Sequence, residues 1–292
     1  MQLGSCLPKL KRLNPKVLQL ATQFDVVSPL DWLCPSVLVY EGITTQYDVI
    51  KALGNTRLRG HCLIAAKDEY LLTIWGGRCR GKDWAGQRVN LSKSQQKAII
   101  LNHTQNTIRK FPRVQKWDLI AGNVKPNGQL RFDYVEELLD VAIIANPSKQ
   151  YYLDELLCTS FTRWEKIISM ASNENIGGVG IQIHANNKTN LTATFKLLEK
   201  VLKLAEASNV SVDLSEVGYW DTEEEPAKES RLIEFIETIV NLASDYNVRD
   251  FIWWGLIPYA QHHLLSSPRI VPLFDRDLNP TIVMDNLCHL LP

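Results

Sequence analysis

Hydrophobic positions along this chain form short strand-like runs that alternate with longer stretches of helical periodicity. The strand-like runs lie at Gln2–Cys6, Phe24–Ser28, Leu58–Ala65, Lys116–Gly122, Gln150–Asp154, Gly177–Ile183, Val210–Glu216 and Asp250–Leu256. The main helical stretches lie at Asn14–Gln23, Gln95–Lys110, Phe132–Ala145, Ser160–Ser172, Leu191–Ala207 and Glu229–Tyr246. A 3.6-residue period along one of them should place one face against a sheet, formed by Leu191, Phe195, Leu198, Val201 and Leu202.

Strands that alternate with crossover helices over 292 residues predict an α/β fold, a (β/α)8 TIM barrel. A doubly wound open sheet is the competing fold, but it would favour a glycine-rich first turn, and Met1–Lys11 contains only Gly4. Length alone would allow two domains, yet barrels of this size are routinely one. We therefore expect a single barrel domain over residues 1–292.

The segment from Val210 to Trp220 contains the most suggestive carboxylate. Its β-branched run ends as Ser215 and Glu216 arrive, which is typical of a buried parallel strand that carries a carboxylate at its end. The carboxyl ends of barrel strands form the functional face. Glu216 is therefore either a salt-bridged carboxylate at the rim or a catalytic nucleophile.

Composition narrows the classes of partner. Lys and Arg number 32 and so do Asp and Glu, so no nucleic-acid or membrane partner is indicated. No apolar run approaches the roughly 20 residues that span a bilayer. The six cysteines show no CxxC motif, and they are expected to be reduced. Since the first residues already resemble a strand, we expect a cytoplasmic protein, or a secreted one if a leader was removed.

Nothing in the sequence indicates a cofactor. The adjacent pair His262-His263 could suggest a metal site, but neighbouring histidines in a loop rarely converge on one ion. We therefore predict no metal and no cofactor, and the oligomeric state stays open.

Several strand ends together resemble glycoside hydrolase family 10, the endo-1,4-β-xylanases. The family's RGHTLVW motif is matched by Arg59-Gly60-His61-Cys62-Leu63-Ile64, and its WDVVNE motif by Trp117-Asp118-Leu119-Ile120-Ala121-Gly122. Its GIGLQxH, ITELD and TFWG motifs are matched by 178–184, 214–218 and 252–255, and its closing LFD-xxxxP by Leu273-Phe274-Asp275 and Pro280. Each match is short, but all occur in order and at the right spacing across nearly the whole chain.

The resemblance implies roles for six residues. The family's nucleophile falls on Glu216, and the histidine that orients it falls on His184, beside Gln182. The platform tryptophan falls on Trp254, and His61 and Trp220 are expected to help line a sugar site. If so, these side chains should surround one barrel mouth, with Glu216 and His184 within hydrogen-bond reach.

The family's other catalytic half is missing. Its general acid/base glutamate falls on Gly122, and the asparagine before it falls on Ala121. Other sugar contacts of the family are replaced by Ser28, Pro29, Asp31, Ala65, Ala66 and Gly218. A retaining glycosidase needs two carboxyl groups about 5–5.5 Å apart. The resemblance therefore implies a degenerate site that binds a β-linked oligosaccharide with little or no hydrolysis.

Two alternatives stay open. Glu155 could supply a displaced acid and give an active hydrolase of altered specificity, or it could cap the following helix, with Asp154 echoing an aspartate of the family. The chain could also be a scaffold or regulatory subunit without a ligand, because fold and function separate easily.

Overall fold

The computed structural model describes residues 1–7, 15–29, 44–65, 92–125, 127–157, 160–173, 176–221, 226–258 and 269–291, and everything below refers to them. The strands are β1 Gln2–Leu7, β2 Val26–Pro29, β3 Arg57–Gly60, β4 Ile64–Ala65, β5 Lys116–Ala121, β6 Gln150–Leu156, β7 Gly178–Ala185, β8 Val212–Asp221, β9 Asp250–Trp253 and β10 Arg269–Ile270. The helices are α1 Pro15–Ala21, α3 Thr44–Ala52, α5 Lys93–Lys110, α6 Val135–Ala145, α7 Phe161–Asn173, α8 Leu191–Ala207, α9 Glu229–Asp245 and α10 Ile282–Leu290.

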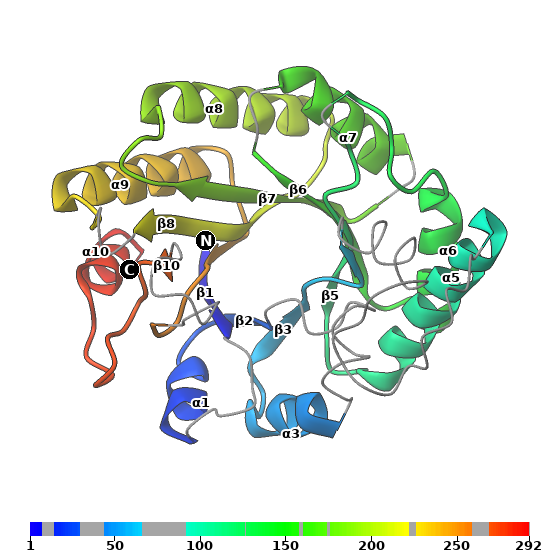
Figure 1. Cartoon of the computed structure of the whole chain (residues 1–292), viewed down its shortest axis with the longest axis horizontal. Helices are drawn as coiled ribbons and strands as arrows, with labels where there is room; N and C mark the ends of the chain where they lie inside the picture. The colour runs from blue at the N-terminus through cyan, green and yellow to red at the C-terminus, as the bar shows by residue number, and fades with distance from the viewer. Residues whose placement is uncertain are drawn as a thin grey trace.

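The predicted barrel is confirmed. Parallel strands pair in the order β8-β7-β6-β5-β3-β2-β1-β9, and a β8–β9 pairing closes the ring, so the sheet is not an open one. Figure 1 shows this ring of strands with the helices outside it. The short strand β10 adds an antiparallel partner to the end of β8. No helix in the described ranges is long and apolar enough to cross a membrane.

The structure corrects three of the predicted boundaries. The run predicted as one strand over Leu58–Ala65 is divided into β3 and β4, both paired with β5, and a cis peptide bond joins His61 to Cys62 between them. Strand β6 continues past Asp154, so Glu155 lies within it. Strand β8 continues to Asp221, because its last residues pair with β10.

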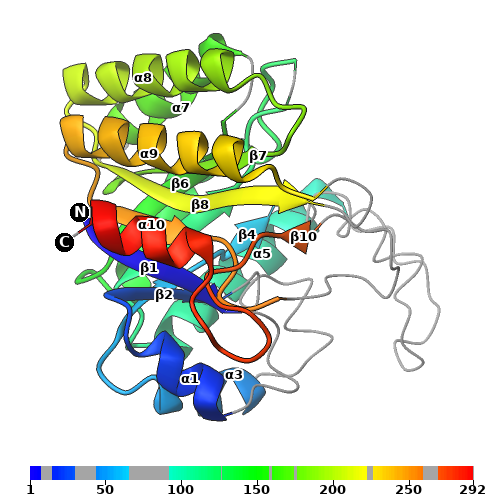
Figure 2. The same cartoon turned by 90° about the vertical axis from the view of Figure 1, so that its left-hand side faces the viewer.

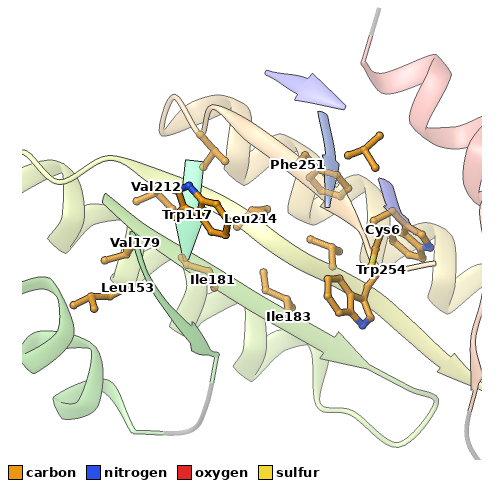
Figure 3. Close-up of a cluster of buried hydrophobic side chains, with 14 of the residues drawn as sticks. Cys6, Trp117, Leu153, Val179, Ile181, Ile183, Val212, Leu214, Phe251 and Trp254 are labelled. Carbon is orange, nitrogen blue, oxygen red and sulfur yellow. The ribbon is translucent and has the colours of Figure 1, made fainter. Parts of the chain in front are cut away.

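The apolar core lies between the strands and the helices. On α8 the predicted face is buried at Leu191, Leu198, Val201 and Leu202, with Phe195 half-buried. Alternate apolar residues of the strands pack against the helices. Figure 3 shows part of this layer, including Leu153, Val179, Ile181, Ile183, Val212 and Leu214. Since side chains alternate along a strand, the other set points into the barrel.

The barrel interior is charged, whereas branched aliphatic residues fill most such barrels. Arg59 lies at the centre with a fully buried side chain. It binds Asp118 on β5, with a shortest separation of 2.5 Å, and Asp213 on β8 at 2.6 Å. Lys116 binds Asp213 and Asp250 at 2.8 Å each. A buried charge is tolerated only when it is paired, so the interior forms one continuous ionic network.

A bulge in β8 turns Glu216 towards this interior. Two steps along β7, from Gly180 to Gln182, are matched by three steps along β8, from Asp213 to Glu216. Asp213 and Ser215 point inwards, so strict alternation would send Glu216 outwards towards the helices. The extra residue interrupts the alternation of side chains along β8, and Ser215 and Glu216 therefore both face the interior.

Candidate active site

Glu216 lies between two histidines at the carboxyl end of the barrel. Its Oε1 is 2.7 Å from Nε2 of His61, and its Oε2 is 3.2 Å from Nε2 of His184. The Glu216 side chain is only 8% exposed. Burial on its own would raise the pKa of Glu216, but the His61 charge and hydrogen bonds from both histidines lower it to about 2. Glu216 is therefore an anion, with the predicted hydrogen bond to His184 in place.

His61 carries the positive charge that Glu216 needs. Its Nδ1 lies 2.9 Å from Oδ2 of Asp118, while its Nε2 faces Glu216. Burial disfavours the charged ring, yet the Glu216 charge and the hydrogen bond to Asp118 outweigh burial and raise the pKa of His61 well above its ordinary value. An imidazolium that donates from both nitrogens suits two carboxylate acceptors. His61 therefore links Glu216 to the ionic network below it.

Asp154 is a further member of the site. From the sequence it was interpreted only as the counterpart of an aspartate of the family. Gln182 and the Ser215 hydroxyl donate to its carboxylate, and its Oδ2 is 3.9 Å from Nδ1 of His61. Burial together with the Asp118 and Glu216 charges raises the pKa of Asp154 to about 7, although His61 and Arg59 oppose the shift. The signal for Asp154 was its position on β6. It lies one residue before Glu155 and in register with Gly180 on the neighbouring strand.

The two predicted aromatic residues lie against the two histidines. The Trp254 ring is 5.2 Å from the His61 ring at 79°, and the Trp220 ring is 5.8 Å from the His184 ring at 64°. Both pairs are edge-to-face contacts, which hold the imidazoles in place. Trp254 is 6% exposed, whereas Trp220, His184 and Gln182 are half-buried. The structure thus brings Glu216, His184, His61, Gln182, Trp254 and Trp220 together at one mouth.

The end of β5 differs in character from this polar cluster. Ala121 packs with Cys62 and Ala65 in a small apolar group. Gly122 follows with φ of +81°, in the left-handed region that favours glycine. Its N–H donates to the carbonyl of Asp154, and its carbonyl accepts a bond from Nε of Arg131 at 2.9 Å. The backbone is therefore fixed in a conformation that a glutamate would adopt only under strain.

The structure does not bring Glu155 to Glu216. The Glu155 carboxylate accepts bonds from the N–H of Val124 at 3.1 Å and from Arg163 on α7 at 2.9 Å. Asp154 points inwards, so the next residue along β6 points towards the helices. Glu155 contacts the first turn of α7 through the Arg163 side chain. Four other positions considered from the sequence, Asp31, Ala66, His262 and His263, lie outside the described residues.

Ligand atoms of His61, Asp118 and Asp154 lie within 4.8 Å of one another, as in a metal site. The Asp118 carboxylate is already bound to Arg59 and His61, and the Asp154 carboxylate to Gln182 and Ser215. A divalent ion would also meet the Arg59 charge directly beside it. These groups are better described as an ion-pair network than as a metal site.

A sequence profile identifies the family, and solved structures share the fold. The sequence profile of Glycosyl hydrolase family 10 matches residues 52–287. Among solved structures, xylanase 10B from Thermotoga petrophila RKU-1 in complex with xylobiose is 16% identical, with a TM-score of 0.77 and coverage of 99% of this chain and 93% of that one. A GH10 endoxylanase from a sugarcane soil metagenome is also 16% identical, with a TM-score of 0.77 and coverage of 99% and 96%.

The intracellular xylanase TsXylA from Thermoanaerobacterium saccharolyticum, in complex with xylotriose, is 15% identical, with a TM-score of 0.76 and coverage of 98% of this chain and 94% of that one. At such identities the structural likeness shows the shared barrel. No curated protein matches the sequence significantly. The profile, however, spans most of the chain, and the chain belongs to glycosyl hydrolase family 10.

Proposed function

We propose that this protein binds a β-linked oligosaccharide at the barrel mouth and hydrolyses it little or not at all. One observation carries the proposal. Glu216 is held as an anion by His61 and His184, whereas the acid/base position of the family is Gly122, fixed at φ of +81°. On the motif resemblance, Glu216 stands at the position of the nucleophile of a retaining glycosidase, and Gly122 stands at the position of its proton donor.

The reaction chemistry explains why this half-site should be slow. Attack by a carboxylate on an unactivated sugar needs a proton for the departing oxygen, and general acid catalysis contributes about 10²–10⁴ in rate. Asp154 holds a proton near neutral pH, but its side chain is fully buried beneath His61, and it accepts bonds from Gln182 and Ser215. It therefore supports the site from below without reaching a glycosidic oxygen.

Sugar recognition would use the half-buried groups at the mouth. Trp220 offers a ring face, and Gln182 and His184 offer polar atoms beside the Glu216 carboxylate. Two structurally similar xylanases were solved with xylobiose and xylotriose, which makes xylo-oligosaccharides the first ligands to test. Since the small group of Cys62, Ala65 and Ala121 offers no polar side chain, we expect weak binding, with Kd on the order of millimolar.

Titration calorimetry with xylotriose tests the proposal. Binding should be weak and tolerant of other β-linked trisaccharides, and Trp220→Ala should weaken it. Trp164→Phe, a change on the buried face of α7 and away from the mouth, should not. Micromolar and xylose-selective binding would contradict a degenerate site. No binding of any glycan would favour a scaffold, and turnover of unactivated xylotriose that Glu155→Gln abolishes would establish the displaced-acid enzyme.

A further inference from the structure

A cavity lies at the other end of the barrel from Glu216. It is open to solvent and has a volume of about 570 Å³. It is lined by residues at the starts of β1, β3, β5, β6 and β9 and by the end of α9 with the turn that follows it. Parallel strands all start at the same end, as Figure 2 shows for β1 and β8, whereas Glu216 lies well along β8. The cavity is therefore separate from the site described above, and its volume is typical of small-molecule sites.

Cationic side chains outnumber acidic ones in its lining. The polar residues that matter most are Arg57, Lys116, Gln150, Asn247, Arg249 and Asp250. Among the described lining residues, three are cationic and one, Asp250, is acidic. Two of the cations already share Asp250, with Arg57 Nη2 at 3.0 Å and Lys116 Nζ at 2.8 Å. Lys116 also binds Asp213 at 2.8 Å, and among the described residues neither of these carboxylates forms an ion pair with the third cation.

Arg249 is that third cation. Its backbone is fixed, since its N–H donates to the carbonyl of Val212 at 3.2 Å and its carbonyl accepts from Gln2 at 2.8 Å. Its side chain is exposed, and no described residue forms an ion pair or hydrogen bond with its guanidinium. A fixed backbone with an unpaired guanidinium beside a cavity resembles a ligand group more than a structural one.

Unused N–H donors lie at the base of the cavity. Lys116 has three N–H donors and uses two of them, on Asp213 and Asp250. Arg57 uses Nη2 and Nε, which leaves Nη1 without a partner among the described residues. Guanidinium groups bind phosphate and carboxylate oxygens in pairs, and the Gln150 and Asn247 amides add neutral donors.

We propose that this cavity is a binding site for a small molecule that carries a phosphate group. Arg249 contacts the phosphate together with the free donors of Arg57 and Lys116. Gln150 and Asn247 contact the remainder of the ligand. The site is distinct from the sugar site at the mouth, and its occupation does not depend on Glu216.

Calorimetry with inorganic phosphate, glucose 6-phosphate and glucose, at ionic strength matched with chloride, tests the proposal. Both phosphates should bind and glucose should not, and a tighter Kd for glucose 6-phosphate would show that the organic part is also held. Arg249→Gln should weaken phosphate binding at least tenfold, because it removes the unpaired cation. Arg276→Gln, the same change at an exposed turn elsewhere, and Glu216→Gln should leave the phosphate Kd unchanged.

Thermal melts of the Arg249→Gln and Arg276→Gln variants should match the wild type, because both side chains are exposed. Phosphate should also raise the melting temperature of the wild type and not of Arg249→Gln. Absence of phosphate binding by the wild type at millimolar concentrations, or equal Kd values for the wild type and Arg249→Gln, would overturn the proposal.

Discussion

Replacing Asp154 by Asn should make the protein more stable at neutral and alkaline pH. Burial beside Asp118 and Glu216 raises the pKa of Asp154 from its ordinary value of 3.8 to about 7. Between these pH values the folded protein keeps the proton while the unfolded chain releases it, so wild-type stability falls as pH rises. An asparagine keeps the shape and carries no such proton. Its amide can still accept from Gln182 and donate to the Ser215 hydroxyl.

The size of the effect follows from the two pKa values. One pKa unit corresponds to about 1.4 kcal/mol, so the difference amounts to about 4 kcal/mol once the pH is well above 7. Near pH 4 the folded wild type and the variant both carry a neutral group, so the remaining difference reports only the exchange of hydroxyl for amide. The free energy of unfolding of Asp154→Asn relative to wild type should therefore rise by about 4 kcal/mol between pH 4 and pH 8.

Urea unfolding followed by circular dichroism at several pH values measures this difference directly. Asp140→Asn, at an exposed position of α6, supplies the baseline for the same chemical change. If the difference in unfolding free energy between Asp154→Asn and wild type is independent of pH, or falls as pH rises, then Asp154 is not the proton-holding group beneath His61.

Three further changes probe the neighbouring groups. Gly122→Glu should cost about 1–2 kcal/mol of stability, because φ is +81° there, and it should not restore hydrolysis of xylotriose; full activity in this variant would show that the β5 end can still hold an acid. Arg59→Met should cost about 3–5 kcal/mol in urea unfolding, because it leaves Asp118 and Asp213 without their buried cation, and a cost below ~1 kcal/mol would argue against the ion pairs. Glu216→Gln should lower the pKa of His61, because it removes the anion 2.7 Å away, and imidazole NMR signals that titrate as in wild type would contradict this.

The barrel and half of the site could be predicted from the sequence because they depend on local patterns. Strand runs end at the mouth, so Glu216 and His184 on neighbouring strands were expected to meet, and they do at 3.2 Å. Helices α3 and α10 were not predicted. Both helices are only nine residues long, and α10 lies beyond the last strand of the repeating pattern.

The ionic network could not be predicted in the same way. Arg59, Asp118 and Asp213 come from three strands that are far apart in the sequence, and their pairing depends on register. Bulges in β5 and β8 shift that register by one residue each, which no hydrophobic pattern reveals. The location of Asp154 inside the barrel, with Glu155 outside it, follows from the same pairing. The family motifs indicated candidate roles for these residues. Their charge states follow from the contacts between strands, which only the structure gives.

We propose that Glu216 acts as a nucleophile without a proton donor. A dinitrophenyl β-xyloside has a leaving group that needs no protonation, so Glu216 can attack it and form a covalent intermediate. Water then reacts slowly, because no base activates it. Azide is small and needs no base, and it should enter beside Gly122 and release the sugar as a glycosyl azide.

Release of dinitrophenol with and without azide is the most direct measurement. We expect slow turnover that azide accelerates, a glycosyl azide product, and complete loss of both in Glu216→Ala, while xylotriose stays intact. Turnover that azide does not change, together with ordinary hydrolysis of xylotriose, would contradict it and show that a working acid/base group is present.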